Sequence, residues 1–301
     1  MLDAKDDLRH PLRPVPHARE SLFYNILLAE EDLMVFIYTW VDAENKAGHL
    51  FAVVGDNNER HAFSAVDGVD IGSADFDDWE VQGLRLRHTD LLRTAELGVT
   101  SENASLTAQF TALHDAFDYV QNEDGCPEFV ADNRFEQAVR VTGELTLNGR
   151  TIPFDTTGHR DHSWGVRDWN AMQDWKWVSA QTADGTALNI MVLHGRGETT
   201  RHGYVFRDGE LSPVAQVRTR AQYDKNWWQT DLDMSVTDAA GRQTQVVLHR
   251  YALLVFGAAD LSLHEAGCRA TINGQDAVAH FECGWDRRYV EAQVARLAGG
   301  H

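Results

Sequence analysis

Residues 156–169 read TTGHRDHSWGVRDW, and they combine several side chains that can do chemistry. These fourteen residues contain two His, two Asp, two Arg and two Trp. A carboxyl group can donate or accept a proton, and a neighbouring imidazole can tune or orient it. An indole face binds apolar ligands and stabilises positive charge. The motif therefore predicts a site where acid–base groups meet an aromatic surface.

The motif is expected to be an extended strand, whose successive side chains point to opposite faces. Alternation over residues 158–165 gives one face His159, Asp161 and Ser163, and the other face Arg160, His162 and Trp164. A β-bulge at Gly158 or Gly165 would bring both sets to one side. The sequence leaves these two arrangements open.

The residue types allow four interpretations. A metal site would use His159 and His162 with Asp161 and Asp168, but H-x-x-H spacing splits across the faces of a strand. A Ser–His–Asp triad would use Ser163, but the chain lacks the G-x-S-x-G elbow. A buried polar network that fastens two domains stays open. We favour general acid–base catalysis by a carboxylic acid whose pKa an apolar cavity raises, and we expect no metal.

Tryptophan is concentrated in and after this motif, which favours catalysis within an aromatic cavity. The residues concerned are Trp164, Trp169, Trp175, Trp177, Trp227 and Trp228. In DWKWVSAQ, residues 174–181, strand alternation places Trp175 and Trp177 on one face. Such a face could bind an apolar ligand or shield a carbocation.

Elsewhere the sequence predicts strands and tight turns. The segments 21–28 and 33–41 are apolar and rich in aromatic and β-branched residues, and 104–113 alternates apolar with polar residues. Asn-Gly and Asp-Gly pairs recur and supply the positive φ of hairpin turns. The best helix candidates are 90–97 and 288–297, although the second also reads as a strand. The sequence predicts an all-β protein of many antiparallel strands.

Two distant segments share one plan, which indicates two domains. Residues 143–165 and 267–287 each read as a strand, an Asn-Gly turn, a returning strand, and then Gly and Trp beside charged residues. Two β domains with similar closing hairpins would explain this repetition. We therefore expect domains at 1–165 and 166–301, which is an ordinary domain size.

Composition limits the partners. The chain has 27 Lys and Arg against 46 Asp and Glu, a formal net charge of -19. An acidic surface repels phosphate backbones and anionic lipid headgroups, so we expect no nucleic-acid or membrane partner. The first residues are charged and no stretch reaches about 18 apolar residues, so we expect no signal peptide, no stable membrane insertion and a cytoplasmic protein. The widely spaced Cys126, Cys268 and Cys283 predict neither a disulfide framework nor a thiolate zinc site. The oligomeric state stays open.

The segment GHRDHSWGVRDW, residues 158–169, resembles the G-Y-x-D-H-x-W-G signature of the carotenoid 1,2-hydratase and AttH-like family of lipocalin-like proteins. Position 159 is His where an aromatic is commoner, and position 163 is Ser where Asn or Gln is usual. The resemblance implies two lipocalin-like antiparallel β-barrel or sandwich domains, with the motif near their junction. Natural-product cyclases and Diels–Alderases are related to this family in fold.

The resemblance implies cofactor-free chemistry on an apolar molecule of terpenoid, steroid or polyketide type. An acid would protonate a C=C bond, and the cation would lead to hydration, isomerisation or cyclisation. Asp161 would donate the proton, and His162 would orient or tune it. The substrate-binding residues would be His159, Trp164, Trp175, Trp177 and Trp227. Further candidates for a second acid–base group are Asp168, Asp174 and His194.

The rival function is a non-catalytic carrier of hydrophobic ligands that uses the same cavity. In a carrier, Asp161 would pair with Arg160 or Arg167 in a network that locks the domains together. We expect both arginines to be structural ion-pair partners.

Overall fold

The structure is a computed structural model that describes residues 2–299. The strands of the first half are β1 (Ala18–Leu28), β2 (Leu33–Asp42), β3 (Lys46–Val54), β4 (Arg60–Asp70), β5 (Trp79–Val81), β6 (Leu84–Asp90), β7 (Thr94–Thr100), β8 (Ala104–Ala112), β9 (Phe117–Asp118), β10 (Asn133–Leu147) and β11 (Arg150–Val166). Those of the second half are β12 (Met172–Thr182), β13 (Ala187–Gly195), β14 (Glu198–Arg207), β15 (Glu210–Tyr223), β16 (Gln229–Asp238), β17 (Gln243–Ala258), β18 (Leu261–Ile272) and β19 (Gln275–Asp286). The helices are η1 (Ala4–Asp7), η2 (Ala29–Glu31), η3 (Asp56–Asn58), η4 (Tyr119–Gln121), η5 (Trp169–Ala171) and α1 (Arg287–Gly299).

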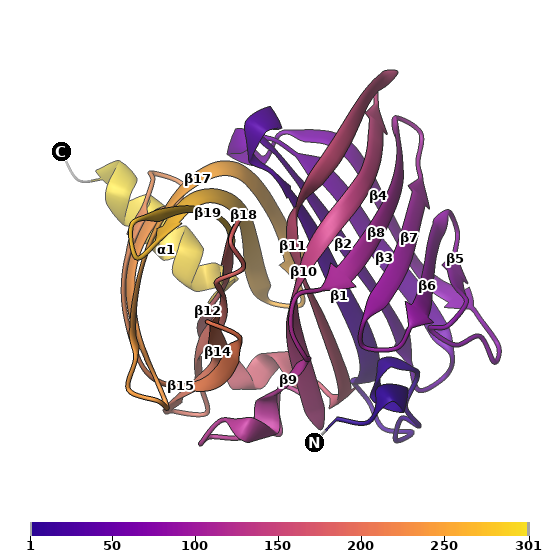
Figure 1. Cartoon of the computed structure of the whole chain (residues 1–301), viewed down its shortest axis with the longest axis horizontal. Coiled ribbons are helices and arrows are strands. Elements are labelled where there is room, and N and C mark those ends of the chain that lie inside the picture. The colour runs from indigo at the N-terminus through magenta and orange to yellow at the C-terminus, as the bar shows by residue number, and fades with distance from the viewer. Residues whose placement is uncertain (1, 300–301) are drawn as a thin grey trace.

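These strands form two antiparallel sheets that lie side by side (Figure 1). The first has the order β4-β3-β2-β1-β11-β10-β8-β7-β6-β5, with β9 paired to β10, and the second is a closed barrel of β12 to β19. The predicted all-β fold of two lipocalin-like domains is confirmed. The chain passes from one sheet to the other between Val166 and Met172. We retain 1–165 and 166–301 as the proposed domain ranges.

The two repeated segments form the last hairpin, in chain order, of each of the two sheets. β10 and β11 meet across Asn148 and Gly149, and β18 and β19 meet across Asn273 and Gly274. The φ angles are 51° and 82° in the first turn and 52° and 82° in the second. Asn and Gly are the residues that adopt this left-handed conformation most readily, which explains why each hairpin turns there.

One of the two helix candidates is a helix and the other is not. Residues 90–97 form a turn closed by the hydrogen bond from Arg93 N to Asp90 O, followed by the start of β7. Strand pairing overrides the weak helical pattern there. Residues 288–297 lie in α1, because the barrel already closes between β12 and β19 and offers this segment no free edge. Within residues 2–299, no helix combines the length and apolar character needed to cross a membrane.

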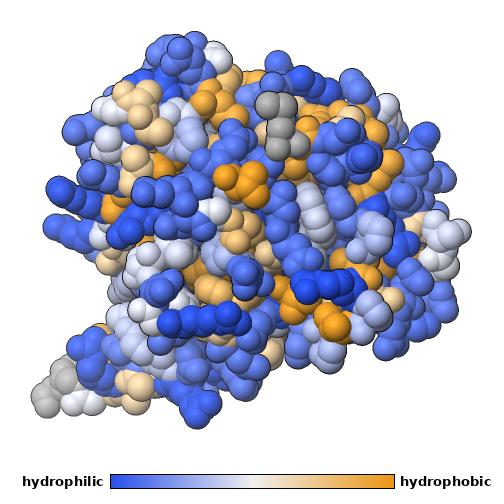
Figure 2. All heavy atoms as spheres, turned by 90° about the horizontal axis from the view of Figure 1, so that it is seen from below, coloured by the Kyte–Doolittle hydropathy of each residue, from blue (hydrophilic) through white to orange (hydrophobic). Residues whose placement is uncertain are grey.

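Three apolar clusters fill the molecule. One lies inside the first sheet and one inside the barrel, and the third packs between the two sheets. The third includes Phe23 and Phe36 from β1 and β2, which contact Trp177 and its neighbours on the barrel. The face drawn in Figure 2 is largely hydrophilic with scattered hydrophobic residues, as the acidic composition requires. The junction of the sheets is therefore the aromatic interior that the tryptophan-rich segments predicted.

The N-terminal segment is fastened to β11 by a buried ion pair. Arg160 donates from Nη1 to Asp7 Oδ1 at 2.8 Å, and Leu92 N donates to Asp7 Oδ2 at 2.6 Å. Burial alone would raise the pKa of Asp7, but the charges of Arg160 and His88 lower that pKa to about 2. The expectation that Arg160 is a structural ion-pair partner is confirmed.

Asp7→Asn is expected to lower the free energy of unfolding by about 3–5 kcal/mol, because it leaves the Arg160 guanidinium buried without a counter-charge. Since folding lowers the pKa of Asp7, its contribution is complete above about pH 4 and is lost as the pH falls toward 2. Urea unfolding at several pH values measures this contribution. As the pH falls below 4, the free energy of unfolding should decrease less in Asp7→Asn than in the wild type. Asp3→Asn, at the exposed N-cap of η1, is the matched control, and an equal effect there would contradict the assignment.

Candidate active site

Strand β11 carries the motif and determines where its side chains point. Its pairing with β10 runs without a register shift from Arg150 to Trp164, and its pairing with β1 is equally regular. The strand therefore keeps strict alternation, and no bulge brings both sets of side chains to one side. Asp161 and its alternate neighbours face the barrel, and His162 and its alternate neighbours face the interior of the first sheet.

A cavity of about 390 Å³ lies between the two sheets, where Asp161 points. This volume is in the range of pockets that take small organic molecules. Its apolar lining includes Phe23, Phe36, Trp40, Trp175, Trp177 and Met191. Trp175 and Trp177 thus lie where alternation along β12 placed them, on the cavity wall.

Four carboxyl groups line this cavity. Asp67 is exposed and lies near Arg19, and the other three, Asp161, Glu265 and Glu282, form a buried cluster. Burial raises the pKa of Asp161 to about 7, with the charge of Glu136 adding to the rise and that of Arg134 opposing it. Burial also raises the pKa of Glu265 and of Glu282 to about 8, helped by Asp161 in the first case and by Glu265 in the second. Each negative charge disfavours the next, so the cluster retains protons near neutral pH.

Neighbouring donors hold these carboxyl groups in place. Arg134 donates from Nη2 to Asp161 Oδ2 at 2.7 Å, and Trp175 donates from Nε1 to Glu282 Oε1 at 2.6 Å. Glu265 and Glu282 are direct partners across β18 and β19. Asp161 Oδ1 makes no hydrogen bond within residues 2–299, so one oxygen of the acid is available to a ligand.

Glu136 is the buried anion behind this site. Its Oε1 accepts from Arg134 Nε at 2.6 Å, from Trp177 Nε1 at 3.0 Å and from the Tyr119 hydroxyl at 3.0 Å. Its Oε2 lies 2.8 Å from His159 Nε2. Burial alone would raise the pKa of Glu136, but Arg134 and the hydrogen bond with His159 lower it. Glu136 therefore stays ionised and shares the Arg134 cation with Asp161.

His159 was expected to bind substrate, and the structure places it elsewhere. It lies outside the lining of the cavity, with Asn25 Oδ1 accepting from its backbone N and Glu136 beside its ring. Burial lowers the pKa of His159, so the neutral imidazole is favoured. Its contacts assign it to the support of Glu136.

His162 and Trp164 point away from the cavity, contrary to the roles expected of them. They lie on the opposite face of β11, and the regular register explains why Asp161 has no imidazole from His162 beside it. His162 Nε2 lies 2.7 Å from Glu20 Oε1, and Trp164 stacks on His10 with ring centroids 3.7 Å apart.

Trp227 also lies outside the cavity that holds Asp161. Its ring stacks on Tyr223 at 4.6 Å and meets Trp285 at 6.2 Å and Tyr289 of α1 at 6.0 Å. These neighbours belong to the barrel and its C-terminal helix. Trp227 therefore packs inside the second domain and does not reach the junction of the sheets.

Asp168, Asp174 and His194 do not supply the second acid–base group either. Asp168 accepts from Asn170 N at 3.1 Å as the N-cap of η5, and Asp174 lies 2.8 Å from His194 Nδ1. All three lie outside the lining of the cavity. These residues lie close to the motif in the sequence, but they do not join Asp161 in the cavity.

The acids that accompany Asp161 were not found from the sequence. Glu265 and Glu282 follow Asp161 by more than a hundred positions in sequence and come from β18 and β19. One signal was available, because Glu282 lies in the second closing hairpin, next to its Gly and Trp. Arg134 and Glu136 lie on β10, whose pairing with β11 the Asn-Gly turn already predicted.

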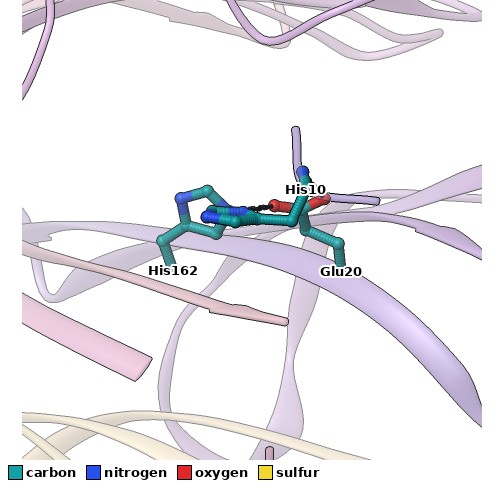
Figure 3. Close-up of side chains that lie close together, drawn as sticks. All are labelled: His10, Glu20 and His162. Carbon is teal, nitrogen blue, oxygen red and sulfur yellow. Dashed lines mark hydrogen bonds and ion pairs between the residues drawn. The ribbon is translucent and has the colours of Figure 1, made fainter. Parts of the chain in front are cut away.

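His10, Glu20 and His162 form the one group in the described residues whose possible metal-ligand atoms all lie within 4.8 Å of one another (Figure 3). Glu20 Oε1 lies 2.7 Å from His10 Nδ1 and 2.7 Å from His162 Nε2. These bonds satisfy the carboxylate and tie the N-terminal segment to β11. The metal site considered from the sequence, which used His159 and His162 together, does not form, because these two side chains point to opposite faces of β11.

Several solved structures have a similar fold, including the following three. A protein described as AttH from Nitrosomonas europaea has a TM-score of 0.65 and 15% identity, over 93% of this chain and 100% of that chain. Kievitone hydratase from Nectria haematococca has a TM-score of 0.62 and 12% identity, over 89% and 88%. CghA has a TM-score of 0.61 and 13% identity, over 90% and 89%. At these identities the likeness shows the fold, and it confirms the predicted AttH-like two-domain architecture.

A comparison with curated protein sequences finds no match. The family described as domain of unknown function (DUF7064) matches residues 3–287. Because this match spans nearly the whole chain, the protein belongs to the DUF7064 family.

Proposed function

We propose that this protein is a cofactor-independent acid–base enzyme that protonates a C=C bond of an apolar small molecule. Hydration, isomerisation or cyclisation would follow from the cation. One observation carries the proposal: a carboxyl group with its pKa raised to about 7 points into an aromatic cavity beside two further protonated acids. The shared fold with kievitone hydratase, whose name assigns it a hydration, supports the same class of chemistry.

Asp161 is the proposed proton donor. With a pKa near 7 it holds comparable amounts of acid and carboxylate at neutral pH, which suits a catalytic acid. Its Oδ1 carries the proton toward the ligand, and Arg134 remains bonded to Oδ2. When the proton moves to an alkene carbon, that guanidinium stabilises the carboxylate left behind. Positioned proton transfer of this kind typically contributes about 10²–10⁴-fold in rate.

The other groups that line the cavity would stabilise the carbocation and take part in the proton transfer that follows. The indole faces of Trp175 and Trp177 line the same cavity and can stabilise positive charge. In a hydration, water adds to the cation, and the proton that the added water loses returns to the Asp161 carboxylate, either directly or through the protonated Glu265 or Glu282. In an isomerisation or cyclisation, the Asp161 carboxylate removes a proton from carbon, so that each turnover regenerates the acid and is neutral overall.

The contacts of Asp161 favour this function over the carrier. Its cation is Arg134, which lies on the neighbouring strand of the same sheet, so this pair does not join the domains. The bonds that cross the junction belong to other groups, including Trp177 Nε1 to Glu136 and Asn25 Nδ2 with His280 Nδ1 at 2.9 Å. A carrier would have no need for an acid of raised pKa in its cavity.

Asp161→Asn is expected to reduce conversion of terpenoid and polyene substrates by at least about 10²-fold, since the amide cannot supply the proton. Wild type and variant are incubated with a substrate panel in D₂O, and mass spectrometry detects added water, incorporated deuterium and new isomers. Asp155→Asn, on the exposed part of β11, is the matched control and should keep full activity. A folded Asp161→Asn protein with wild-type turnover would contradict the assignment.

Activity is expected to fall as the pH rises through about 7, because the donor must be protonated. The charge of Glu282 is among the causes that raise the pKa of Asp161. Glu282→Gln removes this repulsion, so the pKa of Asp161 falls and the alkaline limb of the profile shifts to lower pH. Initial rates from pH 5 to 9, taken with a buffer series, test the direction. If the alkaline limb of the pH–rate profile does not shift in Glu282→Gln, a group other than Asp161 controls the loss of activity at high pH.

A further inference from the structure

A second set of charged groups lines the same cavity, and the proposed proton transfer does not use it. Arg19 lies near the start of β1, and Arg167 follows the end of β11. Arg19 is on the same face of β1 as Phe23, the residue opposite Asp161. Four residues of strand separate Arg19 from Phe23, a rise of about 13 Å. Arg19 thus lies further along the cavity than the acid. Arg167 is nearer, because it donates to Ser163, two residues from Asp161 on the same face of β11.

Neither guanidinium has a carboxylate in ion-pair contact within residues 2–299. Arg167 donates only to neutral oxygens: the Ser163 hydroxyl at 2.6 Å, the Val130 carbonyl at 3.2 Å and the Tyr38 hydroxyl at 3.3 Å. The expectation that Arg167 is an ion-pair partner is therefore wrong. It lines the cavity as a cation that makes no ion pair within this part of the chain, and its charge acts to lower the pKa of Asp161.

The guanidinium of Arg19 has even fewer polar partners than that of Arg167. Its Nε is buried without a hydrogen-bond partner, and its guanidinium lies over the rings of Tyr38 and Trp40, at 5.4 and 5.2 Å. Asp42 and Asp67 are near enough to favour its charged form, but they make no ion pair with it. A half-buried guanidinium without an ion-pair partner is costly, and it is unexpected in a chain with 46 acids and 27 basic residues.

The positive field of this pair already acts on Tyr38. Burial alone would raise the pKa of its phenol, but the charges of Arg19 and Arg167 outweigh burial and lower that pKa. A field that favours a phenolate on the protein would favour an anionic oxygen on a ligand as well. The planar fork of arginine also suits the two oxygens of a carboxylate.

We propose that Arg19 and Arg167, with the Tyr38 hydroxyl beside them, bind one negatively charged oxygen group of an otherwise apolar ligand. The group is a carboxylate or a phenolate, and the aromatic wall holds the body of the molecule. This inference rests on the proposed function in that the anchored ligand would present its double bond to Asp161. The substrate class is then an unsaturated apolar acid or phenol, and not a plain hydrocarbon.

Equilibrium binding tests this anchor without any turnover. The probes are naphthalene-2-carboxylate and its methyl ester, followed by quenching of tryptophan fluorescence. A second pair is 4-nitrophenol and 4-nitroanisole, in which the phenolate absorbance reports ionisation of the bound phenol. We expect the carboxylate to bind at least about tenfold more tightly than its ester, as a charge-assisted hydrogen bond implies. Selectivity in one pair alone assigns the anion as carboxylate or phenolate.

Arg19→Met should abolish this selectivity and leave ester binding and melting temperature unchanged, because Arg19 makes no hydrogen bond whose loss would disturb the fold. Arg220→Met, on the exposed surface of the barrel, removes the same charge and should retain selectivity. Equal binding of acid and ester by the wild type would overturn the proposal, as would selectivity that persists in Arg19→Met or disappears in Arg220→Met. Full turnover in Asp161→Asn would overturn the proton donor alone and leave the anchor standing.

Discussion

The candidate site depends on one buried anion, the carboxylate of Glu136. A charge in this position requires donors on every side. Arg134, His159, Tyr119 and Trp177 supply them from β10, β11, η4 and β12. These contacts connect the two sheets, so the cavity between them has a fixed shape. Arg134 also donates to a second acid, because its Nη2 is bonded to Asp161 while its Nε is bonded to Glu136.

This sharing of Arg134 explains how Asp161 differs from Glu136, although both carboxyl groups are buried and both contact Arg134. Glu136 collects several donors and stays ionised. Asp161 receives one hydrogen bond from Arg134 and faces an apolar cavity with Glu265 and Glu282 nearby, so its proton is retained to a higher pH. Two acids of different function arise from their surroundings and not from their chemistry. The same cavity is lined by two arginines, Arg19 and Arg167, that make no ion pair within the described residues, and this supports the proposed binding of an anionic group on an apolar molecule.

The motif performs two tasks because a strand has two faces. One face presents Asp161 to the cavity. The other uses Arg160 and His162 to hold the N-terminal segment through Asp7 and Glu20. The concentration of charged and aromatic residues in this stretch therefore combines a face that carries the proposed proton donor with a face that holds the N-terminal segment. On this second face, the polar network considered from the sequence fastens the N-terminal segment to β11 instead of two domains to each other. The acid–base interpretation concerns the other face and stays a proposal.

The sequence by itself determined the strands, the Asn-Gly hairpins and the acidic surface. It also determined that Asp161 faces away from His162 if the strand is regular, and that Trp175 and Trp177 share a face. These properties follow from local periodicity and turn chemistry, which adjacent residues encode. Only the tertiary structure decided that no bulge interrupts β11, and that Trp227 packs within the barrel. It alone brought Arg134, Glu265 and Glu282 to Asp161. Contacts between strands far apart in the chain depend on how the sheets pack, and they produce no recognisable pattern of residue spacing in the sequence.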